Sequence, residues 1–414
     1  MIPLLLILSM SCGRESSKRS PKPKQDLRIN EIQVIGSHNS YKTAIEPALM
    51  KILMKEDSAT FFALNYSHVK LERQLDLGLR KLELDIVHDP EGGRFATPLG
   101  LSLLHQQGIE SQSYDPDSVM YQPGFKVLHV QDLDFRSNCL RLKDCLQEIK
   151  TWSDAHPDHL PIAISFNAKT DVINRPGFVR PLGFGPAAFD SLDAEIKSII
   201  HEDRIIKPDD IRGGYATLED AALAGNWPKL EESRGKFLFV LDEGPQKRAA
   251  YLKDHPNLLG RVMFVDADPG DPAAAFIIFN DPIKHLDSIQ SLVRMGYMVR
   301  TRADANTLEA RVGDLARLQA ALKSGAQFIS TDYYLDENPF GTRYKAEPHT
   351  HLSATDAHAP FCHKRTRTFL PQTHTHLSAT DAHAHFSHRR TRTCLPQTHT
   401  HLSSTDAHAP VCHR

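Results

Sequence analysis

An alternation of short apolar runs with amphipathic stretches, between residues 28 and 346, constrains this chain more than any other feature. Nine runs of five to eight residues are rich in Val, Ile and Phe, which favour strands. Several are separated by stretches with helical spacing of apolar residues, at 68–78, 140–157 and 307–325. The nine candidate strands lie at 31–36, 80–87, 125–129, 161–167, 236–242, 261–265, 275–279, 297–301 and 326–330.

This alternation predicts a parallel sheet wrapped by helices, and the length of the region suits a single TIM (β/α)8-type barrel. Eight strands close such a barrel, so one of the nine runs is expected to be an accessory strand or a loop. A doubly wound open sheet is the alternative, but no G-x-G-x-x-G motif follows the first candidate strand.

Polar residues stand at the ends of several candidate strands. His38 and Asn39 follow the first, and Glu83 and Asp85 lie two residues apart in the second, which puts both carboxylates on one face. His129 ends the third. Because the active site of a barrel lies at the carboxyl ends of its strands, we expect these side chains to meet at one mouth.

Further polar residues end the later strands. Asn167 and Lys169 follow the fourth candidate strand, and Arg302 lies at the end of the eighth. Asn39, Glu83, Asp85 and Asn167 supply the oxygen atoms that Ca²⁺ prefers, while histidines exchange protons near neutral pH. Taken singly, each residue is as easily explained by a structural hydrogen bond or salt bridge. Their joint occurrence predicts a metal site flanked by an acid and a base.

The overall charge gives no reason to expect a nucleic-acid partner, since 49 Lys and Arg balance 51 Asp and Glu. Residues 1–27 begin with the apolar run MIPLLLILSM and turn abruptly polar and basic, which is typical of an export signal followed by a linker. The run is too short to span a membrane. Cys12 stands where a lipoprotein signal would place its modified cysteine, so lipidation and a plain signal both remain open.

Residues 347–414 form a histidine-rich repeat with a period of 25 residues. The repeat starting at His349 returns at His374 and, cut short, at His399. It has few large apolar residues, so we expect a tail without ordered structure, although histidines at H-x-H spacing could bind transition metals. Residues 28–346 are expected to be the single catalytic domain.

Two cysteines, Cys139 and Cys145, lie inside the patterned region. In an exported protein they could form a local disulfide. Free thiols are the alternative, because six residues within one helix would hold them too far apart.

Six stretches resemble the calcium-dependent phosphatidylinositol-specific phospholipase C family of bacteria and fungi, a TIM-barrel phosphodiesterase family. They cover about residues 28 to 344 in order: NEIQVIGSHNSYK, QLDLGLRKLELDIVHDPEGG, KVLHVQDLDFRSNC, CLQEIKTWSDAHPDHLPI, VRTRADANTLEAR and SGAQFISTDYY.

The resemblance implies cleavage of phosphatidylinositol at a membrane surface to diacylglycerol and a cyclic inositol phosphate, by attack of the inositol 2-hydroxyl. His38 and His129 match the family's catalytic histidines. Asn39, Glu83 and Asp85 match its calcium ligands. Asn167 stands where the related eukaryotic pattern has glutamate, which implies one negative charge fewer at the site.

Lys169 and Arg302 are the candidate phosphate or inositol contacts. A glycerophosphodiester phosphodiesterase is the enzymatic alternative, although His38 is followed by Asn-Ser where those enzymes usually carry His-Arg-Gly. An inactive barrel that binds metal or lipid at a surface is the alternative of another class. The sequence predicts no oligomeric state.

Overall fold

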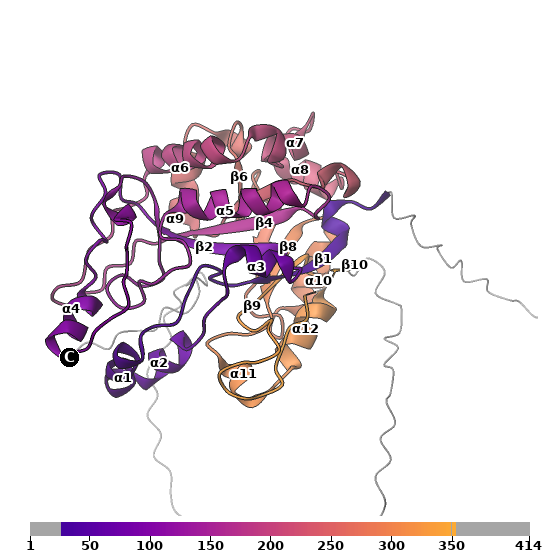
Figure 1. The fold of residues 1–414 in the computed structure, drawn as a ribbon. Helices are drawn as coiled ribbons and strands as arrows, with labels where there is room; N and C mark the ends of the chain where they lie inside the picture. Colours follow the sequence, from indigo (N-terminus) through magenta and orange to yellow (C-terminus); the bar gives the residue numbers. More distant parts are fainter. Residues whose placement is uncertain (1–25, 349, 353–414) are drawn as a thin grey trace, which may run out of the picture.

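The computed structural model describes residues 26–348 and 350–352 (Figure 1). Eight parallel strands form a nearly closed barrel, in the order β6-β5-β4-β2-β1-β9-β8-β7. An isolated parallel bridge between Asp266 and Phe276 joins the two outer strands. The barrel strands are β1 (Ile32–Ser37), β2 (Lys81–Val87), β4 (Ile162–Ala168), β5 (Phe237–Leu241), β6 (Met263–Val265), β7 (Phe276–Ile278), β8 (Met298–Arg302) and β9 (Phe328–Thr331).

Two further strands lie outside the barrel path. β3 (Lys126–Val127) pairs antiparallel with β2, and β10 (Thr350–Leu352) pairs antiparallel with β1. All nine predicted strands are therefore present, and the run at 125–129 is the accessory one. The predicted TIM-type barrel is confirmed, and the open doubly wound sheet is excluded by the order of the strands.

Helices cover the outside of the barrel (Figure 1), and short 3-10 turns lie in several connections. The helices are α1 (Pro47–Glu56), α2 (Ser58–Leu64), α3 (Leu71–Asp76), α4 (Leu99–Gln106), α5 (Leu142–Ala155), α6 (Pro186–Ile199), α7 (Pro208–Arg212), α8 (Leu218–Leu223), α9 (Pro245–Leu252), α10 (Leu286–Met295), α11 (Leu308–Val312) and α12 (Ala316–Ser324). The 3-10 turns are η2 (Ile29–Glu31), η3 (Val119–Tyr121), η4 (Glu202–Arg204), η5 (Glu231–Ser233) and η6 (Pro256–Leu258). None of these helices is long and apolar enough to cross a membrane.

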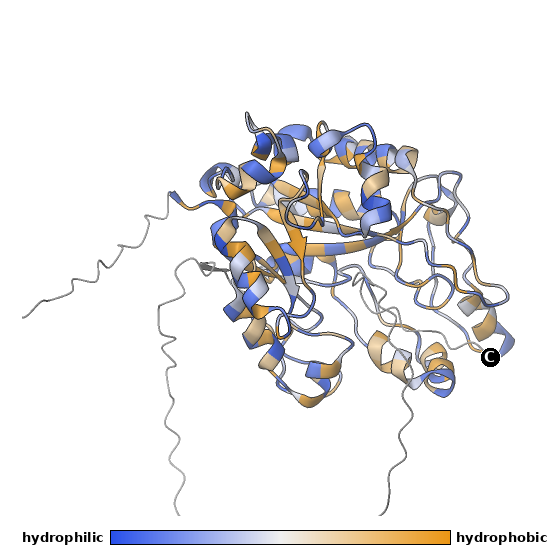
Figure 2. Ribbon diagram, turned by 180° about the vertical axis from the view of Figure 1, so that it is seen from behind, coloured by the Kyte–Doolittle hydropathy of each residue, from blue (hydrophilic) through white to orange (hydrophobic). Residues whose placement is uncertain are grey.

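The barrel strands are buried almost throughout, because helices pack on their outer faces and side chains fill the interior. In Figure 2 the central strands are largely in the apolar colour, whereas the outer helices carry both colours, as expected for helices with one apolar face. At Gly36 the backbones of β1 and β2 approach so closely that a Cβ would overlap the carbonyl oxygen of Lys81. This glycine allows the strand that leads to His38 to lie against the strand that carries Glu83 and Asp85.

Several helices belong to loops that follow the carboxyl ends of strands. α1 and α2 follow β1, α4 follows β2, and α11 follows β8, and all four lie along the lower side of the molecule in Figure 1. The mouth of the barrel is therefore surrounded by helical insertions, as expected for the end that carries an active site.

A disulfide joins Cys139 to Cys145. Helix α5 begins only at Leu142, so Cys139 lies before the helix and the two Cα atoms are 5.3 Å apart. The question that the sequence left open is thus answered by where the helix begins. The predicted export signal with Cys12, and the repeat beyond Leu352, lie outside the described residues.

Candidate active site

The loop after β1 brings His38 and Asn39 to the mouth of the barrel. The His38 amide donates to the carbonyl of Thr331 at the end of β9, and the Ser40 amide donates to the carbonyl of Glu83 in β2. Asn39 adopts a left-handed backbone with φ of 45°, a conformation that asparagine tolerates better than most residues. The chain thus turns sharply where the strand ends, with its loop tied to both neighbouring strands.

The His38 ring lies between two carboxylates. Nδ1 is 3.0 Å from Asp332 Oδ1, and Nε2 is 3.6 Å from Glu83 Oε1. A guanidinium nitrogen of Arg302 also lies 3.2 Å from Nδ1. Arg302 can only donate and an ionised Asp332 can only accept, so Nδ1 satisfies one of them at a time. The carboxylate contact is the shorter, which favours a proton on Nδ1 and leaves Nε2 facing the mouth.

Asp332 is buried and charged. Burial alone would raise the pKa of Asp332, but His38, His68 and Arg302 hold that pKa well below its ordinary value. His68 Nε2 lies 3.6 Å from Asp332 Oδ1, and an Arg302 nitrogen lies 3.5 Å from Oδ2. Asp332 therefore stays ionised and can orient the imidazole of His38.

Glu83 is fully buried, with its two oxygens in different environments. Oε2 accepts from Arg300 at 2.8 Å and from Lys81, whereas Oε1 has no hydrogen-bond partner. Burial opposes ionisation, but the two cations hold the pKa of Glu83 well below its ordinary value. Burial also lowers the pKa of Lys81 to about 8. One oxygen of Glu83 is thus anchored, and the other faces His38.

Asp85 repeats this pattern. Its Oδ2 lies 3.3 Å from Lys169 Nζ, and its buried Oδ1 has no hydrogen-bond partner. Burial by itself would lower the pKa of Lys169. Asp85 and other nearby acids outweigh burial, so the pKa of Lys169 lies above its ordinary value. Burial, and to a smaller extent the charge of nearby Asp85, raises the pKa of the Tyr41 phenol, whose hydroxyl has no hydrogen-bond partner.

Asn167 lies beside Asp85 in the parallel register of β2 and β4. Its Nδ2 donates to the carbonyl of Asp242 at 2.7 Å, which fixes the amide and directs Oδ1 away from that carbonyl. Asn39 is fixed in the same way, since its Nδ2 donates to the hydroxyl of Tyr66 at 2.8 Å. Both amides are therefore oriented by their nitrogens, which leaves their oxygens as the candidate ligand atoms.

His129 does not end a barrel strand, in contrast to the sequence-based expectation. It lies two residues beyond β3, which runs antiparallel to β2, and its Nδ1 is 2.8 Å from Asp134 Oδ2. Asp134 also lies 3.3 Å from Lys42 Nζ, which in turn lies 4.6 Å from the ring centre of Tyr66. The Tyr66 ring is 5.9 Å from that of His38. These contacts place both histidines at the same end of the barrel, each with Nδ1 held by an aspartate.

A divalent cation suits the donors at this mouth. Two buried carboxylate oxygens, Glu83 Oε1 and Asp85 Oδ1, lack partners, and a cation would satisfy both. No group of three or more His, Cys, Asp and Glu side chains within the described residues could hold a metal ion. The amide oxygens of Asn39 and Asn167, with substrate and water, would therefore have to complete an oxygen shell of the kind that Ca²⁺ prefers.

The structure shows contacts that the sequence analysis did not anticipate. Neither Asp332, which follows the last strand, nor Asp134 is among the candidate site residues that the sequence predicts. Lys81 and Arg300 were not linked to Glu83. A signal existed for Lys81, because residues two apart in a strand share a face with Glu83. Arg300 reaches Glu83 across the barrel, so only the closed sheet reveals that contact.

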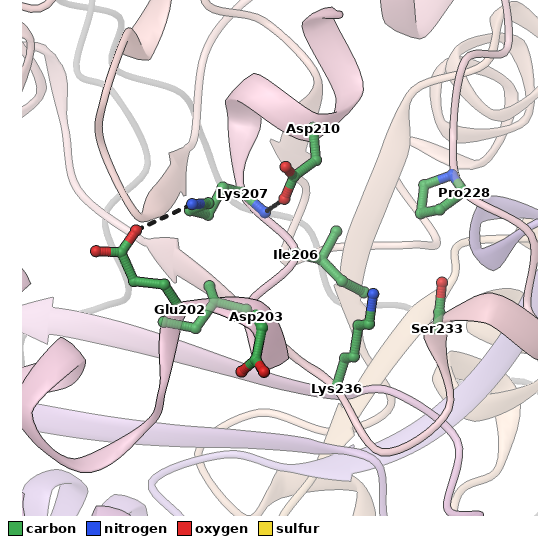
Figure 3. Close-up of a pocket in the computed structure, with 9 residues that line it drawn as sticks. Glu202, Asp203, Ile206, Lys207, Asp210, Pro228, Ser233 and Lys236 are labelled. Atoms are coloured by element: carbon green, nitrogen blue, oxygen red, sulfur yellow. Dashed lines mark hydrogen bonds and ion pairs between the residues drawn. The ribbon is translucent and has the colours of Figure 1, made fainter.

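Figure 3 shows a pocket that lies away from this mouth. It has a volume of about 260 Å³ and lies beside Ile205, which bridges to Phe237, the first residue of β5. Two of its charged side chains, Glu202 and Lys207, pair at 3.0 Å. The start of β5 belongs to the opposite end of the barrel, so this pocket is not part of the candidate active site.

Buried carboxylates, oriented amides and two histidines at the mouth of a barrel are a set of groups that suits hydrolysis assisted by a hard cation. Residues 27–356 match the family model described as Ca²⁺-dependent phosphoinositide phospholipase C. The chain belongs to this family, whose members are phosphoric diester hydrolases. The resemblance seen in the sequence, the predicted enzyme class and the predicted calcium dependence of the family are thereby confirmed.

Several solved structures are similar to this chain. A calcium-dependent phosphoinositol-specific phospholipase C from Pseudomonas sp. is 16% identical over 80% of this chain and 96% of its own, with a TM-score of 0.48. The Ca²⁺-dependent phosphatidylinositol-specific enzyme from Streptomyces antibioticus is 20% identical over 74% and 95%, with a TM-score of 0.46. The phosphatidylinositol-specific phospholipase C from Listeria monocytogenes is 11% identical over 74% and 90%, with a TM-score of 0.40. No curated protein sequence matches the chain at a significant level.

Proposed function

We propose that this chain cleaves phosphatidylinositol to diacylglycerol and an inositol phosphate, with His38 and His129 as the acid and base pair. The observation that carries the proposal is Glu83 Oε1, which has no hydrogen-bond partner and lies 3.6 Å from His38 Nε2, while Asp85, two residues on in β2, holds a second oxygen without a hydrogen-bond partner. A base and the donors for a cation thus share one mouth, as phosphoryl transfer requires.

Asn39, Glu83, Asp85 and Asn167 would hold the Ca²⁺ ion. When bound, the ion would stabilise negative charge on the phosphoryl oxygens and acidify the attacking hydroxyl. The anchoring of Glu83 Oε2 by Lys81 and Arg300 leaves Glu83 one oxygen for a ligand, and Lys169 does the same for Asp85.

The inositol 2-hydroxyl is the nucleophile in this proposal. Its oxygen attacks phosphorus, its proton passes to His38 Nε2, and the bond from phosphorus to the glycerol oxygen breaks. His129 gives a proton to that leaving oxygen, which produces diacylglycerol and a cyclic inositol phosphate. Each histidine has Nδ1 beside an aspartate, Asp332 or Asp134, so Nε2 is the atom that moves the proton.

Lys169 and Arg302 are the proposed contacts to phosphate or inositol. Lys169 lies beside Asp85 and Arg302 beside His38, so both cations are close to the place where a phosphate would bind. Arg302 also contacts Asp332, so Arg302 helps to orient His38 through that carboxylate.

Apolar side chains near the mouth support a substrate held in a lipid surface. In and next to α11, which follows β8, Leu308 is 51% exposed, Val312 77% and Leu315 39%. Leu308 and Val312 line a shallow hollow with Glu309, Arg311 and Asp314. Exposed apolar clusters of this kind are typical of surfaces that contact protein or membrane.

We further propose that the protein is exported, with residues 28–346 as its catalytic domain. The disulfide between Cys139 and Cys145 supports export, because disulfides persist mainly in oxidising compartments.

The test is hydrolysis of phosphatidylinositol vesicles by the full chain, titrated with Ca²⁺ and then with chelator. We expect turnover that requires Ca²⁺ and is lost in His38→Ala and in His129→Ala. Glycerophosphodiesters form a second arm, and turnover of these alone would reject the proposal. Full activity of His129→Ala would reject its assigned role.

A further inference from the structure

The short strand β10 occupies a gap in the barrel beside β1. Its register places Leu352 opposite Ile32, His351 opposite Gln33 and Thr350 opposite Val34. β2 reaches β1 only at Gly36, where it pairs with Lys81. The first half of β1 would therefore present an unpaired edge on this side without β10.

The backbone of Gln33 faces this edge. Val34 donates its amide to Gln327 on the β9 side, and Ile35 accepts from Arg80 on the β2 side. Successive residues of a strand direct their backbone groups to opposite sides, so Gln33 directs its amide and carbonyl toward β10. Pairing of this kind uses main-chain atoms, which every residue except proline supplies in full.

The sequence that forms β10 occurs three times in the chain. His-Thr-His-Leu stands at 349–352, 374–377 and 399–402, with Ser following each time. We propose that the edge of β1 from Ile32 to Val34 is a docking site for this tetrapeptide, and that any of the three copies can occupy it. The occupant is thus the protein's own repeat, and the second and third copies are replacements for the first.

The length of chain that connects each copy to the domain determines how often that copy is bound. Residues 346–348 lead directly to the site, since the amide of Ala346 donates to Tyr333 and Pro348 lies next to Gly78. The second and third copies must close loops that are 25 and 50 residues longer. The entropy of closing a loop grows slowly with its length, so these copies remain competitive when the first is missing.

Hydrogen exchange of the backbone at residues 32–34, measured by mass spectrometry in the full chain and its variants, tests this proposal. The deletion 349–373 removes one whole period and brings His374 directly after Pro348. We expect it to protect β1 as the parent does. His351→Pro removes one donor and should also leave β1 protected, because a later copy takes its place.

The triple variant His351→Pro, His376→Pro and His401→Pro, and a chain ending at Pro348, should both lose at least about tenfold in protection at Gln33. A peptide of residues 374–384 added to the chain ending at Pro348 should restore protection, whereas the same peptide with His376→Pro should not.

Three results would overturn the proposal. His351→Pro alone could expose β1 as fully as the triple variant, which would tie the site to the first copy. The triple variant could keep full protection, which would show that no copy is needed. Protection in His351→Pro could rise with protein concentration, which would assign the strand to a second molecule. If the chain ending at Pro348 fails to fold, the deletion 349–373 and the proline variants of the full chain still test the proposal.

Discussion

His38 Nδ1 and Asp332 Oδ1 lie 3.0 Å apart across the boundary between two adjacent barrel strands. Ser37 and Thr331, the last residues of β1 and β9, are partners in the parallel register. The residues that follow them, 294 positions apart in the sequence, therefore emerge side by side. This relationship links the strand order of the barrel directly to the chemistry of its mouth.

Replacement of Asp332 by Asn should lower kcat by at least about 100-fold with little change in KM, because His38 loses the group that orients it and stabilises its charged form. Steady-state hydrolysis of phosphatidylinositol measures this effect. Asp266→Asn is the matched control: Asp266 follows β6, is half-buried, and accepts from the Ile278 amide without touching a histidine. An equal loss in both variants would contradict the role assigned to Asp332.

Calcium should stabilise the protein, and Asp85→Asn should remove this stabilisation. A ligand at 100 times its Kd adds about 2.7 kcal/mol to the free energy of unfolding. Thermal unfolding with Ca²⁺ and with chelator measures the shift. Asp85→Asn is preferable to Glu83→Gln, because the latter leaves Lys81 and Arg300 facing a neutral amide. Asp193→Asn, in helix α6, serves as the control. A full calcium shift in Asp85→Asn would contradict the assigned ligand.

Asn167→Glu should bind Ca²⁺ more tightly than Asn167→Gln, by about tenfold, since the two side chains have nearly the same shape and differ by one negative charge. Both variants lose the native position of the amide that donates to Asp242, so their difference isolates the charge. Calorimetric titration with Ca²⁺ gives the two dissociation constants. Equal affinities would show that residue 167 does not contact the ion.

The stability of the protein should depend on pH through Asp193. Burial raises the pKa of this carboxyl from 3.8 to about 6, although Tyr251 at 2.9 Å, Arg261 at 3.2 Å and the more distant Lys197 act against the shift. Between these two pH values the folded state holds a proton that the unfolded state has lost. Raising the pH through this window therefore removes stability.

Asp193→Asn cannot titrate, so it provides the reference for this effect. The free energy of unfolding of the parent, minus that of Asp193→Asn, should fall by about 2–3 kcal/mol between pH 4 and pH 7 and then stay level. Denaturant unfolding at several pH values measures the difference. Lost contacts to Arg261 would add only a constant offset. A difference that is flat across this range would contradict the raised pKa.

The barrel was predictable because each of its strands can be recognised from a short run of consecutive apolar residues. Runs such as PIAISFN and KFLFVLD are buried on both faces and need apolar residues at nearly every position. The accessory strand was not distinguishable in advance, because the run FKVLH has the same apolar composition as the others. Its direction depends on its partner, since it pairs antiparallel with β2.

The polar residues at the mouth were predictable as a set but not as a network. His38, Glu83 and Asp85 stand out because they interrupt or end apolar strands. Nothing local indicates that Arg300 reaches Glu83, or that Asp134 holds His129. These pairs depend on side chains that meet across the barrel or through a loop.

The sequence by itself determined the alternation of strands and helices, the family, and the residue types available for chemistry. Each of these depends on residues that are close together in the sequence. Only the tertiary structure decided which oxygen of each carboxylate is anchored and which is unpaired, and which histidine nitrogen faces the mouth. The physical reason is that burial makes each polar atom depend on its nearest partner, and the closed barrel brings those partners together from distant positions in the chain.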